Sequence, residues 1–417
     1  MATPNDEAVL PSKPPQSLCP RTRSSLTIPP RSPIAVPQLK LPQHAYILQQ
    51  SSLASKHDEA REALIAGIKA DEMGPYLATL LSTPSTAALL GPIDPTLLPT
   101  LQKTNEDTLK SLADKLEDAE KNLGESEISE ALKEKAYYLA KIGSLEEALA
   151  AYEVTLAKTA GLGSKIDLRL SMIRLGFFHS VPSIIQENIL KAQVLVDEGG
   201  DWDRRNRLKA YQGLHLLSIR DFKKGGELLL DTVATFTATE LIDYEDFVGL
   251  CVLAGVLTLE RREVKKKIID SPEVIAILPA VPTLSSFTDS LYKCEYATFF
   301  RSLAQIEEHH LLPSRLLSVH ARYYVREMRI KAYAQLLESY RSLTMANLCS
   351  AFGVSEEFID ADLSRFIAAG RLNCSIDRVN GVVETNRPDA KNARYEAVVK
   401  QGDVLLTAVQ RLSRVIG

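Results

Sequence analysis

The sequence lacks long hydrophobic runs and carries little net charge. Its longest apolar stretch, Phe247 to Leu257, is about half of the roughly 20 residues that a bilayer-spanning helix needs. The N-terminus, MATPNDEAVL, has no basic block followed by an apolar block, so no secretory signal is predicted. The formal net charge of -4 over 417 residues disfavours binding to polyanions. We expect a soluble protein of the cytoplasm, the nucleus or both, with neither membrane nor nucleic acid among its partners.

Paired cysteines and clustered metal ligands are also missing. The cysteines are odd in number, and none forms a CxxC pair. Disulfides belong to oxidising compartments and metal sites need ligands close together, so we interpret these residues as reduced thiols. They are Cys19, Cys251, Cys294, Cys349 and Cys374. The sequence therefore predicts neither a disulfide nor a metal site.

The motifs of familiar catalytic sites do not occur. His309 and His310 follow two glutamates without the HExxH spacing of a zinc protease, and adjacent side chains on a helix diverge. The nucleophile motif GxSxG is absent. The run GLGSK at 161–165 lacks the spacing of a phosphate-binding loop and is interpreted as a turn between helices. We predict no catalytic residue, no cofactor and no enzymatic activity.

Proline is abundant only at the start of the chain. Nearly half of the 21 prolines lie in residues 1–42, among serines and with little apolar periodicity. Such a segment cannot bury enough apolar surface to offset its ordering entropy, so a disordered tail is predicted. As an alternative, its PP and PxxP steps would serve as ligands for aromatic-lined grooves.

Helical periodicity begins after this tail and is nearly unbroken. N-terminal helices are predicted over residues 43–130, at 57–72, 75–81 and 95–123. The last of these is rich in alternating charges, which is typical of a solvent-exposed face.

Residues 131–340 repeat one design. Pairs of amphipathic helices bend at Gly143, near 179–182 and at Arg220, roughly every 37 to 40 residues, which is typical of stacked helical hairpins. Because one hairpin cannot bury its own apolar face, we predict a curved solenoid of tetratricopeptide-like hairpins.

Particular residues support these hairpins. Ala148 and Tyr152 fall where a hairpin of this type needs a close contact and a plug. Further helices are predicted at 243–259, 284–304 and 322–340. The last runs directly into the next domain, so the two should form one rigid unit.

Residues 341–388 predict a winged helix, in which two helices precede a small hairpin. Thr344 and Ser355 are suited to cap the two helices, and Gly353 and Gly370 to end them. Phe358, Ile359, Leu363, Phe366 and Ile367 give the second helix an apolar face.

The hairpin of this domain is a candidate docking element. Leu372, Cys374 and Ile376 alternate with polar residues as in a half-buried strand, and the return strand begins at Val382. An exposed hairpin edge can accept a strand from a neighbouring protein.

The second helix of the winged helix is acidic, which disfavours DNA binding. Glu356, Glu357, Asp360 and Asp362 oppose a single Arg365. A recognition helix lies against phosphates and is usually basic. A protein-docking role is therefore favoured over a nucleic-acid role.

The final segment, 389–417, predicts a helix with an apolar seam whose residues are separated alternately by three and four. This is the period of coiled coils and helix bundles, interrupted only by a glycine. The seam consists of Tyr395, Val398, Gly402, Leu405, Val409, Leu412 and Ile416. We favour a helix that joins a bundle with other subunits, and the alternative is a helix folded onto its own winged helix.

Two further motifs stay ambiguous. The basic run from Arg261 to Lys267 is interpreted as a solvated helix end, with an anion site as the alternative. Trp202, the only tryptophan, begins a helix after a GG turn and is either a hydrophobic plug or an interface anchor.

Several long stretches resemble a known family. They are NEDTLKSLADKLEDAEKNLGESEI from Asn105, EGGDWDRRNRLKAYQG from Glu198, RYYVREMRIKAYAQLLESYRSLT from Arg322, FIDADLSRFIAAGRLNCSIDRVNGVVETNRPDAKN from Phe358 and VQRLSRVI from Val409. These stretches are similar to PCI-domain subunits of the regulatory-particle lid of the 26S proteasome. The resemblance covers the chain from about residue 40 onward, and the proline-rich tail departs from it.

The resemblance implies a non-catalytic scaffold for ubiquitin-dependent protein degradation. Such subunits join other PCI subunits of the lid through winged helices, edge strand to edge strand, and their C-terminal helices form a common bundle. It also implies contacts with the lid deubiquitinase module and the base ATPase subunits. The alternative is a PCI subunit of the signalosome, which acts on cullins. The interface residues implied are Leu372, Cys374, Ile376, Val382, Val398, Leu405, Val409, Leu412 and Ile416.

Overall fold

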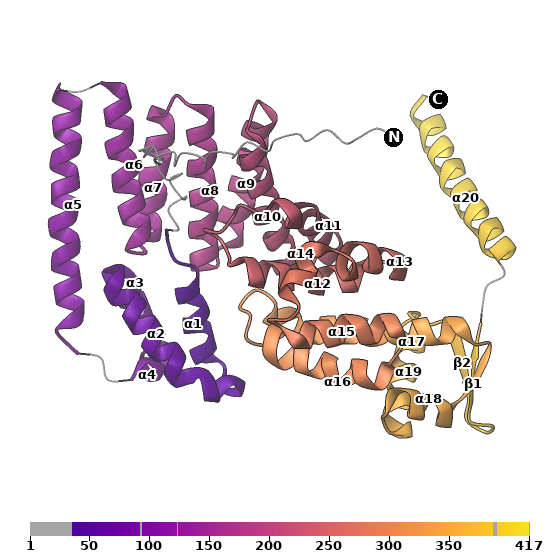
Figure 1. Ribbon diagram of the computed structural model, residues 1–417. Coiled ribbons are helices and arrows are strands. Elements are labelled where there is room, and N and C mark those ends of the chain that lie inside the picture. The colour runs from indigo at the N-terminus through magenta and orange to yellow at the C-terminus, as the bar shows by residue number, and fades with distance from the viewer. Residues whose placement is uncertain (1–35, 92–93, 123, 387–389, 417) are drawn as a thin grey trace, which may run out of the picture. The chain divides into compact units, whose positions relative to one another are not determined.

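A computed structural model describes residues 36–91, 94–122, 124–386 and 390–416, and these are mainly α-helical (Figure 1). The predicted disordered tail lies outside the described residues up to position 35. No helix within the described ranges is long and apolar enough to cross a membrane.

The N-terminal helices share one small core. They are α1 (Lys40–Gln49), a 3-10 helix η1 (Ser51–Lys56), α2 (His57–Ala70), α3 (Gly74–Ser82), α4 (Pro84–Leu90) and α5 (Leu97–Asn122). Leu48, Leu64 and Met73 are buried in this core together with Phe178, which comes from α8.

The predicted tail extended to residue 42, but α1 already begins at Lys40, where Leu41 and Pro42 are buried. Proline is tolerated here because the N–H groups in the first turn of a helix have no partner within the helix.

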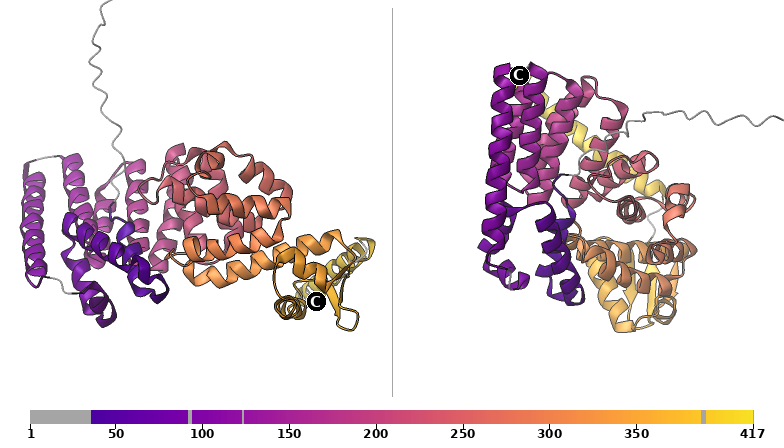
Figure 2. Two further views of the ribbon diagram at one scale, coloured as in Figure 1. Left: turned by 60° about the horizontal axis from the view of Figure 1, so that its bottom comes forward. Right: turned by 60° about the vertical axis from the view of Figure 1, so that its left-hand side comes forward.

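Three antiparallel hairpins follow, as the repeat pattern predicts. They are α6 (Glu125–Lys141) with α7 (Leu145–Lys158), α8 (Leu162–His179) with α9 (Pro182–Asp197), and α10 (Trp202–Ser218) with α11 (Phe222–Thr232). Gly143 makes the first turn in a left-handed conformation (φ 79°), and Ala148 and Tyr152 are fully buried. Each hairpin packs on the next, so tetratricopeptide-like stacking is confirmed (Figure 2).

Shorter helices connect the hairpins to the last long helix of this part. They are η2 (Val233–Thr235), α12 (Tyr244–Thr258), α13 (Arg261–Val264), η3 (Lys265–Ile269), α14 (Pro272–Ile277), α15 (Pro282–Lys293), α16 (Tyr296–Ile306), η4 (Glu307–Leu311), η5 (Ser318–His320) and α17 (Ala321–Ser339). The single helix predicted at 284–304 is wrong, because Cys294 adopts a left-handed conformation (φ 65°) that separates α15 from α16.

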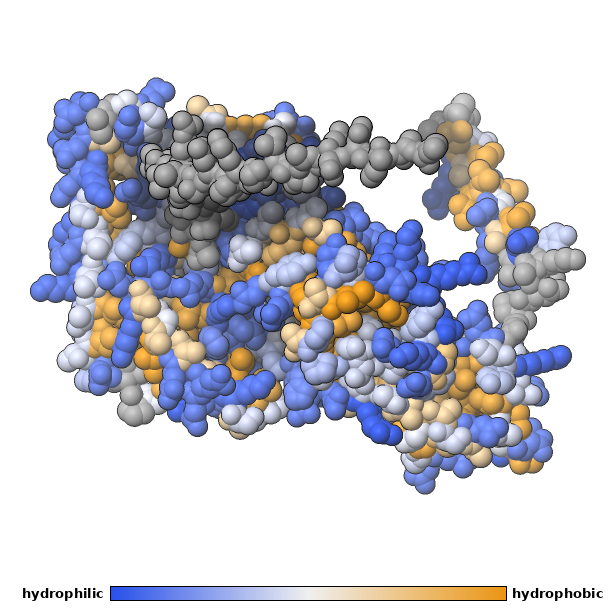
Figure 3. Space-filling view, viewed as in Figure 1, coloured by the Kyte–Doolittle hydropathy of each residue, from blue (hydrophilic) through white to orange (hydrophobic). Residues whose placement is uncertain are grey.

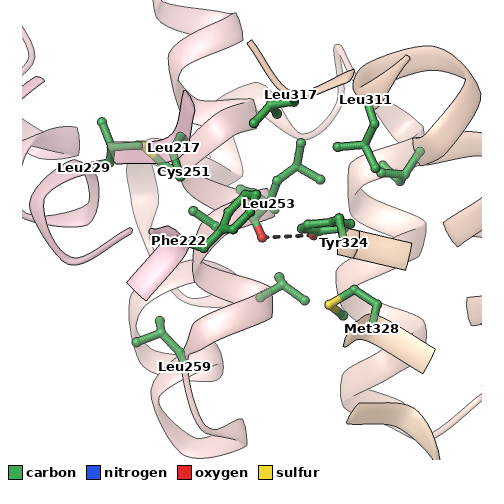
Figure 4. Close-up of a cluster of buried hydrophobic side chains, with 14 of the residues drawn as sticks. Leu217, Phe222, Leu229, Cys251, Leu253, Leu259, Leu311, Leu317, Tyr324 and Met328 are labelled. Carbon is green, nitrogen blue, oxygen red and sulfur yellow. Dashed lines mark hydrogen bonds between the residues drawn. The ribbon is translucent and has the colours of Figure 1, made fainter. Parts of the chain in front are cut away.

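The second and third hairpins share one hydrophobic core with α17. Leu217, Phe222 and Leu253 lie opposite Tyr324 and Met328 in this core, and the Tyr324 hydroxyl donates to the Leu253 carbonyl at 2.9 Å (Figure 4). The same core continues into the winged helix through Phe352 and Leu363.

The winged helix contains a small antiparallel sheet. Its elements are β1 (Ser342–Thr344), α18 (Met345–Phe352), α19 (Glu356–Ala368), β2 (Cys374–Asp377) and β3 (Val382–Thr385), and the strand order is β1-β3-β2. The hairpin was predicted, but β1 was not, because three residues are too few to show an alternating pattern. The chain ends in α20 (Ala390–Ile416).

Candidate docking surfaces

The two helices of the winged helix begin and end as their sequence predicts. The Thr344 hydroxyl accepts the Asn347 N–H at 3.4 Å and caps α18, and Gly353 ends it in a left-handed conformation (φ 66°). Ser355 is the N-cap residue of α19, but its side chain makes no capping hydrogen bond. Gly370 follows α19 with φ 67°.

The acids of α19 are engaged within the domain. Asp362 is buried and lies 2.7 Å from Arg329, and Asp360 lies 2.7 Å from Arg378 on the hairpin. Burial raises the pKa of Asp362, and the neighbouring Arg329 opposes that change. Glu356 and Glu357 remain exposed at the start of α19.

Phe358 was predicted on the buried face of α19, but it is partly exposed. The Arg329 guanidinium lies over its ring, 5.6 Å from the centroid. A cation held over an aromatic face is a favourable contact even near solvent, which accounts for the exposed position.

The sheet has an open edge at β2. Asn386 donates its N–H to the Asn373 carbonyl at 2.9 Å, so the next hydrogen-bonded pairs are Ser375 with Glu384 and Asp377 with Val382. The backbone groups of Cys374 and Ile376 therefore point away from β3. Outward-facing backbone groups of this kind are those with which a strand from another protein would pair.

The hairpin side chains that were predicted to line this interface are buried or half-buried within the protein itself. Leu372 and Cys374 are buried, and Ile376 and Val382 are half-buried. These residues hold the hairpin to the domain, so a docking strand would meet the backbone of β2 and not the Leu372 or Cys374 side chain.

The turn from Asp377 to Gly381 was predicted, but the exposed apolar side chain at its tip was not. Val379 is 94% exposed at the turn, while Asp377 accepts the N–H groups of Val379 (2.9 Å) and Asn380 (3.2 Å). Hydrogen bonds from the Asn380 side chain and from these two N–H groups lower the pKa of Asp377. The turn is thus held in one shape with an apolar side chain at its tip.

Among the described helices, α20 carries the largest number of exposed large apolar side chains, and part of this apolar surface is visible in Figure 3. Every side chain from 394 to 414 is exposed, so this part of the helix is not packed on the winged helix. The predicted seam residues in this part are between 59% (Leu412) and 71% (Tyr395) exposed. The side chain of Ile416 lies outside the described residues.

The apolar face of α20 is wider than the predicted seam. Val399, Val404 and Leu406 are also more than half exposed. The seam uses two positions in each seven-residue repeat. The additional residues widen it to the broader apolar face that is typical of a helix surrounded by several others.

Two other sequence motifs are placed by the structure. Trp202 is 62% exposed at the start of α10, so it is not a hydrophobic plug. Arg261, Arg262 and the lysines 265–267 are exposed around α13 and η3, and Arg261 lies over the Tyr292 ring. The run 161–165 was expected to be an interhelix turn, but only Gly161 lies in the turn, and residues 162–165 form the first turn of α8.

One ring of the histidine pair is hydrogen-bonded within the protein. The His310 ring is hydrogen-bonded to the Thr283 hydroxyl at 3.0 Å. Across the part of the chain that the structure describes, no three His, Cys, Asp or Glu residues gather where they would hold a metal ion. Of the five cysteines, the four within the described residues are free thiols.

Stacked helical hairpins that continue into a winged helix define a PCI-domain protein, and the PCI domain family matches residues 295–387. Two more specific families match as well. The 26S proteasome subunit RPN7 family matches residues 94–267, and the 26S proteasome regulatory subunit RPN7/PSMD6 C-terminal helix family matches residues 394–416.

Similar whole proteins agree with these matches. A 26S proteasome non-ATPase regulatory subunit 6 homolog of Arabidopsis thaliana is 46% identical over 84% of this chain and 89% of its own length. The 26S proteasome regulatory subunit rpn7 of Schizosaccharomyces pombe is 44% identical over 90% of this chain and 95% of its own length. The chain therefore belongs to the family of 26S proteasome non-ATPase regulatory subunit 6, also called RPN7.

The signalosome alternative is supported more weakly. COP9 signalosome complex subunit 1 of Arabidopsis thaliana is 25% identical over 47% of this chain and 45% of its own length. The higher identity and coverage of the proteasome relatives favour the proteasome family.

Proposed function

We propose that this chain is a non-catalytic scaffold subunit of the lid of the 26S proteasome regulatory particle. Its family membership and the names of its relatives, which describe regulatory subunits, support this role. The observation that carries the proposal is the exposed apolar face of α20.

Helix α20 would act by joining a bundle of helices from neighbouring subunits. A single helix is marginally stable in water, and an apolar face gains roughly 25 cal/mol for each Å² that a partner covers. The alternating spacing of Val398, Leu405, Val409 and Leu412 suits packing between neighbouring helices.

The open edge of β2 would supply a second, directional contact. A strand from an adjacent winged helix would pair with the outward backbone groups of Cys374 and Ile376. Edge pairing specifies register, and the bundle contributes apolar area, so the two contacts complement each other.

The expected partners are other PCI subunits of the lid, the lid deubiquitinase module and the base ATPase subunits. The expected location is the cytoplasm and the nucleus, and the wider process is ubiquitin-dependent degradation. No nucleic acid or membrane partner is proposed, in keeping with the acidic α19.

The test is affinity purification of the tagged full-length chain from cells, followed by mass spectrometry. The double variant Leu405→Asp, Leu412→Asp should lose most proteasome companions, because charges would enter the buried face of the bundle. The control Thr407→Asp, Gln410→Asp places the same charges on the polar side of α20, away from the seam, and should retain them.

Full recovery of the proteasome with the leucine variant would contradict the role of α20. Signalosome chains and cullins as the companions of the wild-type protein would replace the proposed complex with the alternative one.

A further inference from the structure

The residues just before α1 connect all three hydrophobic cores of the protein. Residues 36–39, called here the N-terminal strap, contain no helix or strand. Val36 packs against the core formed by α6, α7 and α8. Leu39 packs against both the N-terminal core and the large core that reaches the winged helix. Pro37 between them is buried.

A buried arginine recognises the backbone of the strap. Arg174 of α8 is 2% exposed, and its guanidinium donates to the Val36 carbonyl at 3.1 Å and to the Tyr211 hydroxyl at 3.2 Å. Tyr211 in turn donates to Glu240 at 3.2 Å. A buried cation is costly unless its donors are satisfied, so the Val36 carbonyl completes a polar network inside the repeats.

The chain is anchored again directly after the strap. Lys40 lies 2.6 Å from Asp243, in the loop before α12. The Gln43 side chain accepts the Arg315 N–H at 3.1 Å and also contacts the Pro313 carbonyl. Arg315 donates to the Phe178 carbonyl at 3.0 Å, at the end of α8. These contacts join segments that are distant in the sequence.

We propose that Arg174 and the core surfaces around it form a binding site for a peptide with a central Val-Pro step, and that the N-terminal strap is its resident ligand. The recognition is that of a peptide: one backbone carbonyl meets a fixed donor, and the side chains of Val36, Pro37 and Leu39 pack into the protein. Polar Gln38 points outward and is exposed, as expected of a residue that the site does not recognise.

Attachment to the same chain keeps the site filled. A ligand joined by a short connection has an effective concentration in the millimolar range, so a free peptide of the same sequence cannot compete well. Displacing the strap within the full-length protein should therefore open the site to a free peptide.

The test uses a fluorescent peptide of residues 34–40 and the full-length protein, with binding measured by anisotropy. The variant Val36→Asp, Pro37→Asp should release the strap and bind the wild-type peptide, whereas the wild-type protein should not. The matched control Gln38→Asp changes the exposed residue of the strap and should behave as wild type. A peptide carrying Val36→Asp should not bind any of the proteins.

The role of Arg174 is tested in the released variant and by a second measurement. Adding Arg174→Lys should weaken peptide binding about tenfold or more, because the fixed guanidinium donor to the carbonyl is lost. In the otherwise wild-type chain, Arg174→Lys should speed hydrogen exchange at the amides of residues 38–40 more than in α6 and α7.

The proposal would be overturned if the peptide bound the wild-type protein as tightly as the released variant. It would also be overturned if circular dichroism showed that the released variant is folded and the peptide did not bind it. If the released variant does not fold, hydrogen exchange decides: unchanged exchange of the strap in Arg174→Lys would also overturn it.

Discussion

Arg207 and Glu240 form the most deeply buried ion pair of the helical repeats. Arg207 donates to one oxygen of Glu240 through two nitrogens, at 2.9 and 2.6 Å, and the Glu240 side chain is fully buried. Removing the arginine would leave a buried carboxylate without its cation, although the Tyr211 hydroxyl would still donate to it.

We therefore expect Arg207→Met to lower the free energy of unfolding by about 3 kcal/mol or more. The control is Lys209→Met on the same helix. The Lys209 ammonium lies 3.8 Å from the Asp231 carboxylate in a solvent-exposed ion pair, which contributes at most about 1 kcal/mol. Urea unfolding of both variants measures the difference, and equal losses would contradict a special role for the buried pair.

His179, at the end of α8, makes the protein sensitive to acid. Burial and, to a lesser degree, the nearby Arg315 together lower the pKa of His179 to about 4. An unfolded chain binds the proton near pH 6.5, so stability contributed by neutral His179 is present above that pH and is lost as the pH falls toward 4.

Replacing His179 with Gln should remove this loss. Between pH 7 and pH 4.5 the wild-type protein should lose about 1–2 kcal/mol more than His179→Gln, as measured by urea unfolding at each pH. The exposed His309, changed to Gln, is the control. If both variants keep the wild-type pH dependence, protonation of His179 does not limit stability.

At the scale of elements, the open edge of β2 gives a directional test. The N–H of Ile376 points outward, so Ile376→Pro removes a docking donor without breaking a hydrogen bond to β3. We expect reduced recovery of lid subunits in purification and only a small fall in Tm.

The adjacent Ser375→Pro is the comparison for that variant. Its N–H points toward Glu384 of β3, so the substitution should lower Tm more strongly by breaking the ladder. Unchanged lid recovery with Ile376→Pro would exclude strand pairing along this edge.

Elements with a strong local signal were predictable from the sequence. The turn at Gly143, the buried Tyr152 and the cap at Thr344 follow from periodicity and from the chemistry of single residues. The break at Cys294 was not predictable, because cysteine has no preference for a left-handed conformation and tertiary packing imposes it.

The candidate surfaces were predictable to different degrees. The seam of α20 depends on spacing alone, and its exposure agrees with the prediction of an outward-facing helix. The buried positions of Leu372 and Cys374 depend on how the hairpin lies against α19, which alternation along one strand cannot specify. The contacts of the N-terminal strap join residues more than 130 positions apart, for example Val36 and Arg174, beyond any local pattern.

At the scale of the whole molecule, one core runs from α8 to the winged helix. Residues as far apart as Ile166 and Val383 belong to it. A docking event at the winged helix is therefore mechanically connected to the repeats, because a packed interior transmits strain.

The bare apolar face of α20 has a consequence for a copy that has not yet found its partners. Chaperones and proteases recognise exposed apolar segments, and such segments promote aggregation. An orphan subunit should thus be short-lived, and its abundance in the cell should follow the supply of the proteins that cover this helix.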